Sequence, residues 1–161
     1  MARNIIVGMA DLAVTAAPGV LTTLGLGSCV GIALYDPGAK VAGLAHIMLP
    51  DSTKIQNNSN VGKFADTALV KLILDMTAIG AKKNRLQAKI AGGAQMFAFN
   101  STNENMRIGD RNVEATLKLL KLNQIPLVAY EVGANYGRTV ELYAEDGRML
   151  IKTIGHGNRI L

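Results

Sequence analysis

The stretch CVGIALYDPGAKVAGLAHIML, residues 29–49, holds two apolar segments joined by the residues DPGAK. The segments cover residues 29–35 and 41–49, and in neither do apolar and polar side chains alternate cleanly. A strand with one face in water does alternate, so this pattern predicts two strands that are covered on both faces. Pro and Gly inside DPGAK favour a turn, and we expect the two strands to form a hairpin about Pro37 and Gly38.

Further strands and two helices are expected on either side of this hairpin. The predicted strands are 5–7, 20–24, 86–93 and 126–132, followed by a hairpin of 138–144 with 148–154. A helix beginning near Lys63 carries an apolar stripe and ends near Gly80; the stripe is Ala65, Ala68, Leu69, Leu72, Ile73 and Met76. A second helix is expected at 110–122, with a stripe of Val113, Leu117 and Leu120.

The order of these elements predicts the fold class. Strands surround two main helices without the regular alternation of a doubly wound sheet, which favours a mixed α/β sandwich. No repeat, low-complexity tract or linker divides the 161 residues, and we expect one domain over 1–161.

Composition restricts where the protein works and what it binds. A single cysteine excludes an intramolecular disulfide or a multi-thiolate zinc site, and fits a reducing compartment. Neither a signal-peptide core nor an apolar run of membrane-spanning length is visible, so we expect a cytoplasmic protein without membrane insertion. The net charge of +5 favours acidic partners, but aromatic residues make up only 4%, which argues against a nucleic-acid-binding surface.

The glycine-rich segment GLGSCVG, residues 25–31, does not have the spacing of a nucleotide-binding motif. Its glycines follow G-x-G-x-x-x-G, no helix is expected after it, and no acidic residue stands where the ribose would need one. We therefore expect no nucleotide cofactor. Two histidines and one cysteine do not suggest a metal site, and His156 is expected in a surface loop.

Cys29 and His46 form the one candidate catalytic pair. If the hairpin turns about Pro37 and Gly38, these two residues stand directly opposite each other on one face of the sheet. A thiol and an imidazole in that position can act as nucleophile and base. A slip of one residue would place them on opposite faces, and Cys29 would then be a buried structural residue. Thr23 is either an ordinary strand residue or the group that orients the histidine ring.

Five segments in order along nearly the whole chain resemble one bacterial family. They are TLGLGSCV, AHIMLPDS, GKFADTAL, AKIAGGAQMF and RIGDRNVEA, and they look like the CheD family of chemoreceptor glutamine deamidases. The resemblance implies an α/β sandwich similar to that of the Cys/His deamidase toxins. It also implies an amide hydrolase that converts receptor glutamines to glutamate, in some members with methylesterase activity, during adaptation in chemotaxis.

By this resemblance, Cys29 is the nucleophile, His46 the general base and acid, and Thr23 the residue that orients the histidine. An imidazolium would stabilise the thiolate, and backbone N–H groups of Gly27 and Ser28 are expected to bind the oxyanion of a reaction that proceeds through a thioester. No metal or cofactor is implied.

The implied partners are the cytoplasmic helical domain of chemoreceptors, as substrate, and a CheC-type phosphatase as regulator. Two other interpretations remain open. The chain could be a non-catalytic adaptor that binds receptor or CheC through the same face, or a basic module that binds nucleic acid with steep salt dependence.

Overall fold

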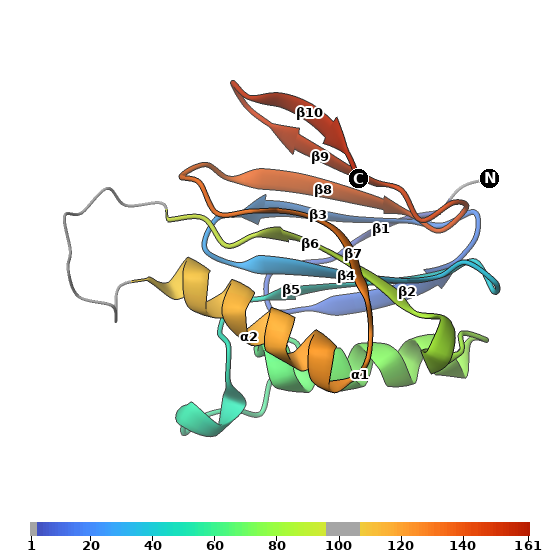
Figure 1. The fold of residues 1–161 in the computed structure, drawn as a ribbon, viewed down its shortest axis with the longest axis horizontal. Helices are drawn as coiled ribbons and strands as arrows, with labels where there is room; N and C mark the ends of the chain where they lie inside the picture. Colours follow the sequence, from blue (N-terminus) through green and yellow to red (C-terminus); the bar gives the residue numbers. More distant parts are fainter. Residues whose placement is uncertain (1–2, 96–106) are drawn as a thin grey trace.

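The computed structural model describes residues 3–95 and 107–161, and in this part of the chain ten strands form two five-stranded sheets. The sheets pack face to face, and both α-helices lie on the outer face of one of them (Figure 1). We call the sheet without helices sheet A and the sheet backed by helices sheet B. The chain therefore has three layers: sheet A, sheet B and the helices.

Neighbouring strands are mostly antiparallel in both sheets. Sheet A has the order β1 (Asn4–Ile6), β3 (Val20–Leu26), β8 (Arg138–Tyr143), β9 (Met149–Thr153) and β10 (Gly157–Ile160). Sheet B has the order β2 (Leu12–Ala16), β5 (Val41–Ile47), β4 (Val30–Asp36), β6 (Gln87–Gly92) and β7 (Leu127–Val132). Only β1–β3 and β6–β7 are parallel among the pairs of the described strands. The predicted class, a mixed α/β sandwich with two main helices, is confirmed.

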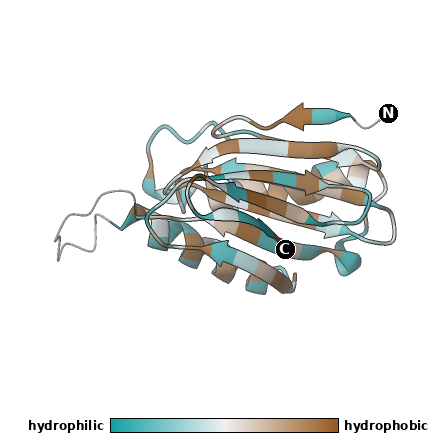
Figure 2. Ribbon diagram, turned by 90° about the horizontal axis from the view of Figure 1, so that it is seen from above, coloured by the Kyte–Doolittle hydropathy of each residue, from teal (hydrophilic) through white to brown (hydrophobic). Residues whose placement is uncertain are grey.

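The central strands of sheet B separate two hydrophobic cores. Along β4, Ile32 and Leu34 belong to the core shared with the helices, whereas Ala33 and Tyr35 belong to the core between the sheets. Every residue of β4 and β5 is buried, as the lack of alternation predicts. Figure 2 shows hydrophobic residues along several of the strands and hydrophilic residues in several of the connecting loops.

The hairpin of β4 and β5 is longer at its turn than the sequence predicts. Asp36 pairs with Val41, so residues 37–40 form a four-residue loop, and the register is shifted by two residues. The Asp36 carboxylate accepts hydrogen bonds from the Gly38 and Ala39 N–H groups at 2.8 and 3.2 Å, which stabilises this loop. His46 consequently faces Gly31 and not Cys29. The predicted direct pairing is wrong, but a shift of two keeps both residues on the same face.

The two helices pack against sheet B in different ways. α1 (Ala65–Ala78) buries most of its predicted stripe and approaches β5 closely, because a Cβ on Gly43 would lie 2.7 Å from the sulfur of Met76. α2 (Ile108–Leu122) buries Asn112 and Thr116 beside Leu120. The predicted stripe of α2 is partly wrong, since Leu117 is 41% exposed. The 3-10 turns η1 (Ser52–Lys54) and η2 (Lys83–Arg85) flank α1.

Two edge strands, β2 and β10, are not predicted from the sequence. β2 is a short run of mostly apolar residues, and β10 is exposed along its whole length, so neither has the alternating pattern of a half-buried strand.

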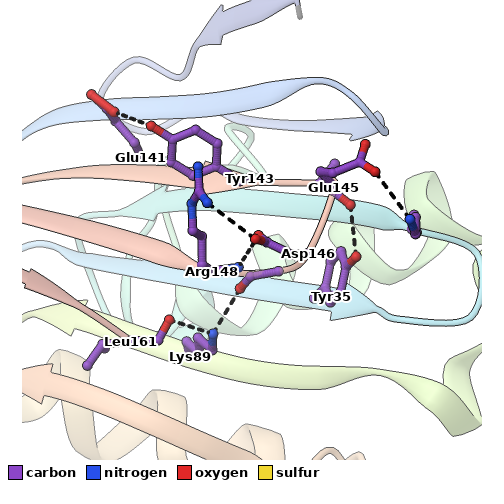
Figure 3. Close-up of polar contacts among 11 residues, drawn as sticks. Tyr35, Lys89, Glu141, Tyr143, Glu145, Asp146, Arg148 and Leu161 are labelled. Carbon is purple, nitrogen blue, oxygen red and sulfur yellow. Dashed lines mark hydrogen bonds and ion pairs between the residues drawn. The ribbon is translucent and has the colours of Figure 1, made fainter.

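Polar side chains tie the two sheets together at one end of the sandwich (Figure 3). Lys89 on β6 donates hydrogen bonds from Nζ to the carbonyl oxygens of Gly147 and Leu161, both at 2.8 Å. The Tyr35 hydroxyl donates to the carbonyl of Ala144 at 2.8 Å. Tyr35 lies six residues from Cys29, roughly 20 Å along the strand, so the candidate catalytic residues occupy the other end.

Candidate active site

Thr23 and His46 meet between the two sheets, and Cys29 lies in the same layer between them. Thr23 belongs to β3 of sheet A, His46 to β5 of sheet B, and Cys29 directly precedes β4. Thr23 and His46 are in direct contact, with 2.7 Å between Oγ1 and Nδ1. Cys29 lies in the core between the sheets, on the face of sheet B that carries His46. His46 faces Gly31, and Cys29 stands two residues before Gly31, one residue beyond the last pair of the ladder, Val30–Ile47.

The hydrogen bonds of Thr23 define which nitrogen of His46 carries the proton. The Thr23 hydroxyl has a single hydrogen, and it donates that hydrogen to the carbonyl oxygen of Val7 at 2.7 Å. Towards His46 the hydroxyl must then accept, so Nδ1 of the neutral ring is protonated. Nε2 is left with a free lone pair, and it has no hydrogen-bond partner among the described residues. This is the tautomer that a general base requires.

Burial governs the ionisation of both candidate catalytic groups. Cys29 is 7% exposed and His46 is 1% exposed. Burial raises the pKa of the Cys29 thiol, and the opposing effect of the Cys29 backbone N–H is smaller. Burial also lowers the pKa of His46. Both shifts favour a neutral thiol beside a neutral imidazole, which differs from the thiolate–imidazolium pair expected from the sequence.

Backbone contacts fix the segment that carries Cys29. The carbonyl of Gly27 accepts from the N–H of Ala94, and the carbonyl of Cys29 accepts from the N–H of Gly93, both at 2.8 Å. A Cβ on Gly92 would overlap the carbonyl oxygen of Cys29. Glycine at position 92 therefore permits β6 to approach the nucleophile segment this closely. From the sequence, Gly92 and Gly93 are expected only at the end of a strand.

The backbone donors predicted for an oxyanion are not equivalent in the structure. The Gly27 N–H donates to the carbonyl of Gly25 at 3.0 Å, within a tight turn where Gly25 has a positive φ of 69°. That N–H is already engaged. Ser28 is partly exposed and next to Cys29, and its role as a donor stays a prediction.

Asn112 on α2 is a residue of this region that the sequence analysis does not identify. Its Nδ2 donates to the carbonyl oxygens of Ser28 at 3.0 Å and Met48 at 2.9 Å. One feature of the sequence points to Asn112: it stands four residues before Thr116 and eight before Leu120. This spacing places its polar side chain on the same helix face as Leu120, which is the buried face.

An ion pair between a buried arginine and a half-buried glutamate lies close to the same end of sheet B. Arg138 forms an ion pair through Nε with the Glu131 carboxylate and donates from Nη1 to the carbonyl of Gly92 at 3.2 Å. The Arg138 guanidinium also lies over the ring of Tyr136, 4.7 Å from its centroid. His156 is exposed, as predicted, and its ring stacks on the ring of Tyr136, with 4.1 Å between the ring centroids.

Residues 3–95 and 107–161 contain neither a metal-binding cluster nor a membrane-spanning helix. In this part of the chain, no three His, Cys, Asp or Glu side chains come together in an arrangement able to hold a metal ion. Neither described helix combines the length and apolar character needed to cross a bilayer.

Comparison with known proteins identifies the family. A family model described as CheD chemotactic sensory transduction matches residues 48–153. A protein of Caldanaerobacter subterraneus subsp. tengcongensis, named probable chemoreceptor glutamine deamidase CheD, is 62% identical over 94% of this chain and 93% of its own length. The chemoreceptor glutamine deamidase CheD of Halalkalibacterium halodurans is 53% identical over 95% of each chain. A crystal structure of a Neisseria meningitidis DUF152 protein aligns with a TM-score of 0.49 at 10% identity, covering 91% of this chain and 72% of that one. On the family match and the curated relatives, the chain belongs to the CheD family.

Proposed function

We propose that this chain deamidates glutamine side chains of chemoreceptors, with Cys29 as nucleophile and His46 as general base and acid. The observation that carries the proposal is the free lone pair on Nε2 of His46, which follows from the hydrogen bond between Nδ1 and Thr23. The names of the curated relatives support glutamine in chemoreceptors as the substrate.

In the first half of the reaction, the thiol proton of Cys29 passes to Nε2 of His46 while sulfur attacks the carboxamide carbon of the glutamine. The carbon–oxygen double bond opens to an oxyanion, and the N–H groups of Ser28 and Cys29 are the donors we propose for it. The imidazolium then gives its proton to the departing nitrogen. The carbon–nitrogen bond breaks, ammonia leaves and a thioester remains.

In the second half, water loses a proton to Nε2 and attacks the thioester carbon. The carbon–sulfur bond breaks, sulfur takes the proton back from His46, and glutamate is released. Each step uses only water and residues of this chain. The same sequence would release methanol from a glutamyl methyl ester, which is the basis for a proposed methylesterase activity.

Burial of the neutral pair agrees with this order of events. A thiol that ionises only as it attacks is suited to a base that is itself neutral. Because Cys29 is 7% exposed, the substrate must present a long side chain that protrudes from its surroundings. A glutamine on the surface of a receptor helix has that form, and conversion of its side chain to glutamate adds a negative charge to the receptor during adaptation. A CheC-type phosphatase is the proposed regulator.

Mass spectrometry of a chemoreceptor cytoplasmic fragment tests the function directly. After incubation with wild type, some glutamines should gain about 1 Da with release of ammonia, and Cys29→Ala should leave all of them unchanged. Should wild type bind the fragment, leave every glutamine intact and behave like Cys29→Ala, the adaptor interpretation would replace the deamidase.

A further inference from the structure

We propose that Asn112 is a positioning residue that fixes the nucleophile segment relative to the strand of the catalytic histidine. The inference rests on the roles proposed for Cys29 and His46. Asn112 itself has no exposed surface, and its Nδ2 donates to Ser28 O at 3.0 Å and to Met48 O at 2.9 Å. Both partners are acceptors only, so the amide must present its nitrogen to them.

The two carbonyls belong to the two segments that carry the chemistry. Ser28 precedes the nucleophile, and Met48 follows two residues after His46. The ladder between β4 and β5 ends at the pair Val30–Ile47, so Ser28 and Met48 both lie beyond its last pair. Asn112 therefore links these segments where the backbone ladder no longer does.

The start of α2 is seated so that the amide reaches this position. A Cβ on Gly109 would lie 2.6 Å from the carbonyl oxygens of Gly93 and Ala94, which means that the helix backbone packs directly on residues 93–94, just after β6. The N–H groups of these two residues donate hydrogen bonds to Cys29 O and Gly27 O. α2 and its amide thus hold the nucleophile segment from the side of the helices, behind the catalytic face.

The amide makes this link although one of its own polar atoms stays unpaired. Its Oδ1 is buried without a hydrogen-bond partner in the described part of the chain. Burying an unpaired polar atom is unfavourable, but an apolar side chain would leave the carbonyls of Ser28 and Met48 without this donor. What the amide adds, and an apolar side chain cannot, is the pair of hydrogen bonds that joins Ser28 to Met48.

The test compares Asn112→Ala and Asn112→Asp with Thr116→Val. Thr116 is also fully buried, lies one turn further along α2, and donates to the Asn112 carbonyl at 2.8 Å. Its loss removes one buried hydrogen bond of the helix without breaking the link to Ser28 and Met48. Three quantities are measured for each variant: Tm, kcat and KM on a receptor fragment, and the rate of Cys29 alkylation by iodoacetamide against pH.

We expect Asn112→Ala to lower kcat by up to ~100-fold with a smaller change in KM, because a displacement of about 1 Å can cost that much. The alkylation profile of Cys29 should change with it, because the thiol is no longer held in the same position relative to His46. Asn112→Asp should be at least as impaired, since a carboxylate faces two carbonyls without a hydrogen to donate. Thr116→Val should lower Tm while it keeps kcat and the alkylation profile within about twofold of wild type.

Two results would overturn the proposal. One is an Asn112→Ala variant with the kcat and alkylation profile of wild type. The other is a Thr116→Val variant that loses as much kcat as Asn112→Ala at the same loss of Tm, which would reduce Asn112 to a contributor to stability. If wild type does not deamidate the fragment, the proposed function fails, and the alkylation profiles still decide whether Asn112 fixes Cys29.

Discussion

Thr23 and His46 are joined across the two sheets by a hydrogen bond of 2.7 Å between Oγ1 and Nδ1. The imidazole of His46, a residue of sheet B, is therefore oriented by Thr23 of sheet A. The hydroxyl of Thr23 in turn donates a hydrogen bond to Val7 O. The tautomer of His46 depends on the packing of the two sheets.

Replacing Thr23 by valine should separate ring orientation from the presence of the ring. Thr23→Val keeps the shape of the side chain but removes the acceptor for Nδ1–H, so the proton can move to Nε2 and block the base. We expect kcat to fall by a part of the ~10²–10⁴-fold that general base catalysis supplies. Thr23→Ser keeps the hydroxyl and should retain most of the activity. Nitrogen chemical shifts of His46 would report the tautomer, and a valine variant with unchanged shifts and kcat would contradict this role.

The pH dependence follows from the burial of the two catalytic groups. Because the pKa of Cys29 is raised, its alkylation by iodoacetamide should have a midpoint above the ~8.5 of an ordinary thiol. Because the pKa of His46 is lowered, kcat/KM should persist below pH ~6.5 and fall only when His46 takes up a proton. A thiol that titrates well below pH 8 would show that the resting pair is ionic.

Asp36 should make stability depend on pH in the acid range. Burial of this carboxylate opposes its ionisation, but hydrogen bonds from Arg85 and from three backbone N–H groups outweigh burial and lower its pKa from 3.8 to about 2. The unfolded chain then binds more protons between these values, so stability rises with pH there and is lost as pH falls towards 2. The contribution at neutral pH is about 2 kcal/mol. Urea unfolding at pH 2–5 should show a steeper dependence in wild type than in Asp36→Asn, and equal slopes would argue against it.

Two glycines with similar backbone conformations provide a matched pair for the nucleophile segment. Gly92 and Gly80 have φ values of 106° and 112°, but only at Gly92 would a Cβ overlap the backbone of Cys29, whereas nothing lies within 4 Å at Gly80. Both alanine variants should lose about 1–3 kcal/mol from backbone strain. Gly92→Ala should in addition displace Cys29 and lower kcat at least tenfold, while Gly80→Ala keeps kcat. Equal kcat values in the two folded variants would contradict the proposed contact.

The sequence predicted the layers of the fold better than its details. The long apolar segments 29–35 and 41–49 predict strands covered on both faces, and the structure places them between two cores. The register was missed because it depends on a local competition at Asp36, whose side chain stabilises a four-residue loop. The edge strand Leu12–Ala16 is not predicted because its apolar residues do not alternate with polar ones and two of them are alanines, which favour strands only weakly.

In the candidate site, too, the residue types could be predicted from the sequence but the tertiary contacts could not. Cys29 and His46 could be nominated from spacing and resemblance, since their chemistry is carried by side-chain type. The role of Thr23 could be named from the resemblance. Its contact with His46 could not be predicted, because that contact forms only when sheet A packs on sheet B. Asn112 could not be assigned, because its partners are backbone carbonyls and these leave no trace in the amino-acid sequence.

The four-residue loop 37–40 sets the register in which β4 lies against β5. A slip of two residues in that register would slide Cys29 past His46 by one pleat and leave both between the sheets, whereas a slip of one residue would turn the whole of β4 over. Cys29 would then point at the helices, and the apolar side chains that now meet α1 would point at sheet A. The candidate catalytic pair therefore stays on one face only in registers that differ from this one by an even number of residues.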